Sequence, residues 1–137
     1  MLKRKKTYPA MARRALRDES GAATIEAILW LPFFIGLFML LVDLAMIFHY
    51  QSTMLRVVQD ANRNLSIHRL KDEQETEHFI TQRLAIITSD PQASTSIVAG
   101  LITTTASAPV TDLDVFGIAK VFQGTRITVR AEHLMEN

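Results

Sequence analysis

Residues 20–42 read Ser-Gly-Ala-Ala-Thr-Ile-Glu-Ala-Ile-Leu-Trp-Leu-Pro-Phe-Phe-Ile-Gly-Leu-Phe-Met-Leu-Leu-Val, and they decide how the chain is organised. The sixteen residues from Ala27 to Val42 carry no formal charge and would extend about 24 Å as a helix. Continuing past Asp43 to Tyr50 supplies the length needed for a hydrocarbon core of about 30 Å. We therefore predict a membrane-spanning helix over residues 22–50. A buried core helix in a soluble protein is the alternative, but the run is too long and too uniformly apolar for so small a domain.

Two residues inside this run need explanation. Pro32 removes a backbone donor, yet a membrane helix tolerates proline, especially near its start. Glu26 stands where the apolar run begins, and an ionisable group costs at least about 3 kcal/mol near the centre of a bilayer. Glu26 therefore lies either at the polar border with no partner or against a group that pairs with it.

Charge is distributed unevenly around the span. The whole chain of 137 residues has a net charge of +1. Residues 1–21 contain seven basic and two acidic residues, a net +5, whereas residues 22–137 contain eight basic and twelve acidic residues, a net −4. A basic segment before an apolar run predicts a cytoplasmic N terminus, and the acidic remainder argues against nucleic acid as a partner.

A secretory signal removed after the apolar run is a second alternative. That interpretation requires a cleavage site with small residues just beyond the run, and Phe48-His-Tyr-Gln51 offers none. We therefore expect a retained span, with the N terminus in the cytoplasm and the residues from about 50 onward outside.

The residues Gly21-Ala-Ala-Thr-Ile-Glu26, followed by an apolar helix, resemble the processing signature of type IV pilin-like proteins. The longer phrase through Leu31-Pro32, with the basic leader before it and Asp43 late in the span, resembles the TadE/TadF-like minor pilins (pseudopilins) of the tight-adherence (Flp) pilus system. Major Flp pilins have an aromatic residue directly after the glutamate, where this chain has Ala27. With the long segment beyond the membrane, this difference favours a minor component.

This resemblance implies roles for individual residues. A prepilin peptidase would cut between Gly21 and Ala22, removing the leader 1–21. Glu26, now the fifth residue of the mature chain, would pair with the new ammonium at Ala22 or with that of a neighbouring subunit. Pro32 and Asp43 would be features of the assembly helix. A glycine before the cleaved bond also suits a narrow active site, because it has no side chain.

Beyond the span the pattern becomes amphipathic, and it predicts one helix from about residue 24 to 70. Its apolar stripe consists of Ile47, Tyr50, Met54, Val57, Ala61, Leu65 and His68, at spacings of three and four. Gln51, Arg56, Gln59, Asp60, Arg63 and Ser66 fall on the other side. Such a stripe packs on its own domain or on a partner helix.

The remaining chain predicts a second short helix and a sheet. Asp72 is placed as an N-cap, with Glu75 three residues later, and the helix is expected to reach about Ile87 with Phe79, Ile80, Leu84 and Ile87 on one face. Strands are expected over 94–105, broken at Gly100, and near 115–122, and after a turn at Gln123-Gly124 over 125–132. The predicted fold is α+β and pilin-like, a long helix with a small antiparallel sheet.

No catalytic pattern emerges. The chain has no cysteine, and its histidines (His49, His68, His78 and His133) lack the i, i+4 spacing of a helical metal site. The glycines are dispersed, so no phosphate loop is expected. Asp112 and Asp114 are better explained by turn formation than by acid–base chemistry. We expect no enzyme and no cofactor.

The predicted function is a minor pilin of a tight-adherence pilus, involved in pilus assembly and surface adhesion. It comprises a leader (1–21), an assembly helix (22–50) and a periplasmic or extracellular α+β domain (51–137). The expected partners are a prepilin peptidase, other pilin subunits, the inner-membrane assembly machinery and lipid. Two alternatives stay open, a type II secretion pseudopilin, whose leader is usually shorter, and an uncleaved signal-anchored envelope protein with a binding domain. A cytosolic nucleic-acid binder using Lys3–Lys6 is less well supported, because topology explains these charges better.

Overall fold

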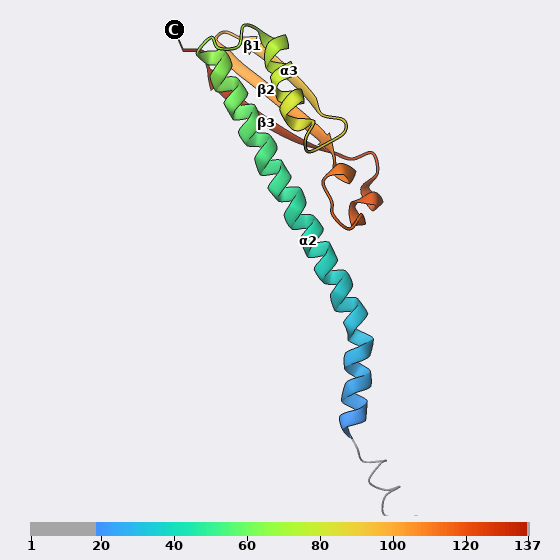
Figure 1. The fold of residues 1–137 in the computed structure, drawn as a ribbon. Helices are drawn as coiled ribbons and strands as arrows, with labels where there is room; N and C mark the ends of the chain where they lie inside the picture. The colour runs from blue at the N-terminus through green and yellow to red at the C-terminus, as the bar shows by residue number, and fades with distance from the viewer. Residues whose placement is uncertain (1–18, 137) are drawn as a thin grey trace, which may run out of the picture. The chain divides into compact units, whose positions relative to one another are not determined.

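The computed structural model describes residues 19–136, so most of the expected leader, residues 1–18, lies outside the described part. The elements follow in the order α2 (Glu19–Ser66), α3 (Glu73–Leu84), β1 (Gln92–Val98), β2 (Leu101–Pro109), the 3₁₀ turns η1 (Val110–Asp112) and η2 (Ile118–Phe122), and β3 (Arg126–Leu134) (Figure 1). The predicted α+β class is confirmed. The chain divides into two compact units, Met1–Phe38 and Met39–Asn137, and each is described by itself.

The C-terminal part of α2 packs through an apolar stripe, as the sequence predicts. Met54, Ala61 and Leu65 are fully buried or nearly so. Val58 is the buried valine, whereas the predicted Val57 is only partly buried beside it. A stripe of residues spaced by three or four rotates slowly around a helix of 3.6 residues per turn. At the edge of the stripe, either of two adjacent residues such as Val57 and Val58 can therefore be the buried one.

Two polar positions depart from the predicted pattern. Asn62 and Ser66 are buried, although Ser66 was expected on the polar side.

The helix ends at Ser66 and not near residue 70, because His68 adopts a left-handed conformation with φ 59°. The N–H groups of Arg69 and Leu70 then donate to the carbonyl of Asn64 at 2.8 and 3.2 Å. His68 is exposed, so its placement on the stripe was wrong.

The second helix begins as predicted. The Asp72 carboxylate accepts a hydrogen bond from the Glu75 N–H at 2.8 Å, and the Glu75 carboxylate accepts one from the Lys71 N–H at 2.8 Å. The helix ends at Leu84, three residues earlier than expected, although Ile87 still packs against the core. Ile80 and Leu84 are fully buried.

The sheet is antiparallel, in the order β1-β2-β3. Ala99 and Gly100 connect β1 to β2 with positive φ values of 51° and 79°, the conformation of a two-residue hairpin turn. The predicted break at Gly100 is confirmed. Alternate residues of β2, from Ile102 to Ala108, are buried, so one face of the sheet is covered and the other is not.

The core lies between this covered face and the two helices. It brings together Met54, Val58 and Ala61 of α2, Ile80 and Leu84 of α3, Ala106 and Ala108 of β2, Val129 of β3, and Leu113. Figure 1 shows α3 (yellow-green) lying next to β1, on which it packs. The expected small sheet packed on the helical stripe is therefore present.

The strand predicted near 115–122 is wrong. This segment forms a loop that ends in η2, and β3 follows from Arg126. The N–H groups of Val115, Phe116 and Ile118 donate to the carboxylate of Asp43 at 2.9, 2.8 and 3.1 Å. Gly117 has φ 81°, which favours glycine. The three N–H groups, which a strand would donate to a neighbouring strand, thus all donate to the side chain of Asp43.

Candidate processing and assembly site

Gly21 and Ala22, the predicted processing residues, lie near the start of α2. Gly21 is exposed, and a Cβ built on it would meet no atom within 4 Å. Its φ is not in the left-handed region either. Neither packing within the described residues nor backbone conformation therefore requires a glycine at position 21.

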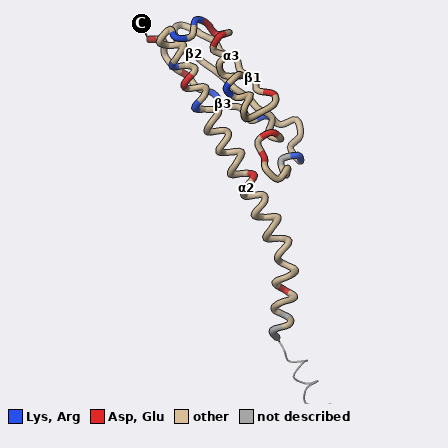
Figure 2. Tube along the Cα trace, in the orientation of Figure 1, with Lys and Arg blue, Asp and Glu red and all other residues tan. Residues whose placement is uncertain are grey.

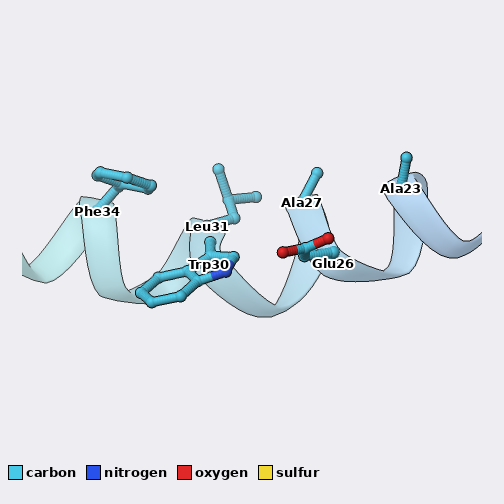
Figure 3. Close-up of a pocket in the computed structure, with 6 residues that line it drawn as sticks. All are labelled: Ala23, Glu26, Ala27, Trp30, Leu31 and Phe34. Carbon is cyan, nitrogen blue, oxygen red and sulfur yellow. The ribbon is translucent and has the colours of Figure 1, made fainter.

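Glu26 lies on an open side of α2 with small residues beside it. Ala23, Glu26, Ala27, Trp30, Leu31 and Phe34 line a shallow hollow on the helix surface (Figure 3). The alanines at 23 and 27 leave the backbone accessible, and small residues spaced by four allow two helices to approach closely. The figure shows Glu26 and Trp30 next to each other along the helix.

The Glu26 carboxylate is exposed. Within residues 19–136 no hydrogen bond or ion pair is found for it. Aromatic rings continue the same surface, with centroids 5.6 Å apart for Trp30 and Phe33 and 5.7 Å apart for Phe33 and Phe34. A carboxylate on such an apolar surface needs a partner from elsewhere if it enters hydrocarbon.

Pro32 lies inside α2, and the helix continues through it. The charged residues of the described chain gather on the sheet, on α3, on the loops and on the second half of α2, whereas the first half of α2 is almost free of them (Figure 2). Over Ala23–Ser66 the helix is long and apolar enough to cross a membrane, judged by length and composition.

Asp43 has a structural partner that the sequence did not reveal. It is only 2% exposed, and Oδ1 accepts from Val115 and Phe116 while Oδ2 accepts from Ile118. These donors lie more than seventy positions away in the chain, so no local pattern could identify them. Asp43 fixes the loop after η1 to α2.

Asp112 lies at the end of η1, but its carboxylate binds residues 23 and 24 positions away and not its own turn. Its Oδ2 accepts from the hydroxyls of Thr88 and Ser89 at 2.7 and 2.8 Å and from the Ser89 N–H at 2.8 Å. The hydrogen bond from Thr88, and then those from Ser89, hold the pKa of Asp112 below its ordinary value. The carboxylate ties the segment after α3 to η1. No cluster of three or more potential metal ligands occurs among residues 19–136.

Two other polar anchors were missed. The Asn62 Nδ2 donates to the Ala131 carbonyl at 3.1 Å and joins α2 to β3. The Arg126 guanidinium pairs with Asp90 at 2.6 Å and also donates to the Ser107 hydroxyl at 3.1 Å. Both depend on tertiary contacts, although the position of Asn62 beside Ala61 on the apolar stripe was an available signal.

These features define a class of protein, an α+β domain that follows a helix able to span a membrane. Residues 21–63, about a third of the chain, match the family model described as TadE-like protein. The similarity to TadE-like proteins predicted from the residues is therefore confirmed over this segment, and it points to a protein related to the tight-adherence pilus. No curated protein and no solved structure matches the chain.

Proposed function

We propose that the chain is a minor pilin, or pseudopilin, of a tight-adherence pilus, processed after Gly21 and built into the pilus assembly through α2. The observation that carries this proposal is the TadE-like match, which begins at Gly21 and runs through the apolar helix. Residues 1–20 of the proposed leader therefore lie outside the matching segment, and only Gly21, the residue before the proposed cleavage site, lies inside it. The chain is a substrate of an enzyme and not itself an enzyme.

Cleavage changes both charge and polarity at the start of α2. It removes the +5 segment 1–21 and leaves an ammonium on Ala22. Glu26 lies four residues further along, which is about one helical turn. Within residues 19–136 no contact requires a glycine at position 21, and this supports a role for Gly21 in peptidase recognition.

Assembly then depends on the surface around Glu26. The hollow lined by Ala23 and Ala27 admits a neighbouring helix, and Trp30 and Phe34 extend the contact. A carboxylate buried in such a contact is tolerated when it meets an ammonium and is costly when it stands alone. Pairing of Glu26 with the Ala22 ammonium of a neighbouring subunit would fix the register between packed helices.

The basic leader favours an N terminus in the cytoplasm, which would put the α+β domain in the periplasm. The partners are a prepilin peptidase, other pilin subunits, the assembly machinery of the inner membrane and lipid, without nucleic acid or a cofactor. Incorporation into an extracellular pilus would give the chain its part in surface adhesion.

The experiment is complementation of a deletion strain with Glu26→Gln and Glu26→Ala, with Glu73→Ala as the control on an unrelated turn. Pilus assembly is measured as pilin recovered in the sheared filament fraction. We expect both Glu26 variants to be processed and to accumulate in membranes but to assemble poorly, while the control assembles normally. Normal assembly of Glu26→Ala would contradict the pairing, because a replaceable Glu26 is what the uncleaved signal-anchored alternative predicts.

A further inference from the structure

A short loop of the α+β domain exposes an unusual amount of apolar surface. Within residues 113–124, which we call the apolar loop, Val115, Phe116, Val121 and Phe122 are 55, 51, 82 and 58% exposed. Lys120 is exposed among them. Single exposed apolar residues are ordinary, but several close together mark a contact with a protein or a membrane.

The apolar loop is fixed in place. Leu113 is fully buried in the core at its start, and the Asp43 carboxylate binds the N–H groups of Val115, Phe116 and Ile118. The exposed side chains of the loop therefore project from a backbone that is held by hydrogen bonds to Asp43. Several of the backbone donors that would be costly to bury in a membrane interface already have an acceptor.

The hydrogen bonds to Asp43 determine where along α2 the apolar loop lies. Asp43 directly follows the uncharged run that ends at Val42. The neighbouring side chains Leu41, Val42 and Leu44 are themselves exposed, between 40 and 53%. The apolar surface of the loop thus lies beside exposed apolar residues in the C-terminal part of the predicted span 22–50, and both belong to the unit Met39–Asn137.

We propose that the apolar loop inserts into the outer interface of the bilayer that α2 spans, as a second membrane contact of the domain. This inference rests on the proposed membrane anchoring. Continuity with the exposed apolar end of α2 favours lipid as the occupant. The ammonium of Lys120 suits this position, because a lysine extends its charged end to the headgroups while its stem covers apolar surface.

The chain has no cysteine, which allows single labels to be placed in the full-length protein. Val121→Cys and Phe122→Cys are labelled with an environment-sensitive nitrobenzoxadiazole fluorophore and reconstituted into vesicles of phosphatidylcholine and phosphatidylglycerol. Val98→Cys and Leu134→Cys are the matched controls. Both control residues are exposed and apolar. They pair with Leu101 at the first end of β2, whereas the chain enters the apolar loop after Pro109 at the other end of this strand. A label at Phe38→Cys in the apolar run reports the anchor itself.

We expect lipids with a shallow spin label to quench the labels at 121 and 122 at least about threefold more strongly than those at 98 and 134. Iodide, which stays in the water, should quench the labels at 98 and 134 more strongly than those at 121 and 122. Equal accessibility of all four labels to iodide would overturn the proposal. Protection of 121 and 122 that appears only at a high ratio of protein to lipid would also overturn it, in favour of a protein partner. Lipids with a spin label near the bilayer centre test the label at 38: if they fail to quench it, the proposed anchoring fails too, whereas quenching at 38 alone refutes the loop contact only.

Discussion

Replacement of Asp43 tests how the apolar loop is held. Asp43→Ala removes the acceptor of three backbone N–H groups, at 2.9, 2.8 and 3.1 Å. A hydrogen bond to a charged group shifts an equilibrium about tenfold at the lower end of its range, so three independent bonds would together shift it about a thousandfold. Water can reach the exposed residues Val115 and Phe116 once the loop opens. We therefore expect about 100-fold faster hydrogen exchange at the three amides.

Asp43→Asn refines this prediction because it keeps the shape of the side chain. Its carbonyl oxygen in the place of Oδ1 still accepts from Val115 and Phe116, while its NH₂ group in the place of Oδ2 faces the Ile118 N–H. The side-chain NH₂ group and the Ile118 N–H are both donors, so they cannot form a hydrogen bond with each other. The exchange at Ile118 should therefore accelerate by about tenfold, with smaller changes at the other two amides.

The assay is amide hydrogen exchange followed by NMR on the full-length protein in detergent micelles. Asp60→Ala is the matched control, since Asp60 is an exposed aspartate on the same helix. Unchanged exchange at residues 115, 116 and 118 in Asp43→Ala, relative to Asp60→Ala, would refute the assignment of Asp43 as the residue that anchors the loop.

Three further predictions concern the α+β domain. Leu84→Ala empties a fully buried position in α3 and should lower the free energy of unfolding by about 2–5 kcal/mol in urea titrations; a loss below about 1 kcal/mol would contradict the described core. Ala99→Asn places a residue that tolerates positive φ at the hairpin turn and should raise the free energy of unfolding by roughly 0.5–1 kcal/mol, which a lowered thermal midpoint would refute. The lowered pKa of Asp112, caused by hydrogen bonds from Thr88 and Ser89, means that its stabilisation is present above the ordinary aspartate pKa and is lost as the pH falls through the pKa of the folded state. Stability measured below about pH 4 should therefore decline less steeply in Asp112→Asn than in the unmodified protein, and identical slopes would contradict this.

Local patterns predicted the two helices and the break in the strand at Gly100. Asp72 and Glu75 form their cap within one turn of α3, and the apolar spacing around Met54 and Ala61 marked the buried side of α2. These features depend on residues within a few positions of each other, so a single sequence contains the information. The TadE-like segment was recognised for the same reason, because Gly21 and Glu26 lie at its start.

The failures share a long-range cause. Residues 115–122 have the composition of a strand, yet three backbone donors of this segment bind Asp43, which the sequence analysis had placed late in the membrane span. Asn62 is likewise buried because it reaches the Ala131 carbonyl of β3. A polar residue on an apolar stripe indicates such a contact, but the partner becomes visible only in the folded chain.

The central claim is that the chain is a prepilin-type substrate, and the N terminus of the mature protein tests it most directly. The protein is recovered from membranes of cells that contain a prepilin peptidase, and its intact mass and N-terminal sequence are determined. The account predicts an N terminus at Ala22 and a mass reduced by that of residues 1–21, with the full-length mass restored in cells lacking the peptidase. A mature protein that retains Met1 and the basic leader in both strains would contradict it.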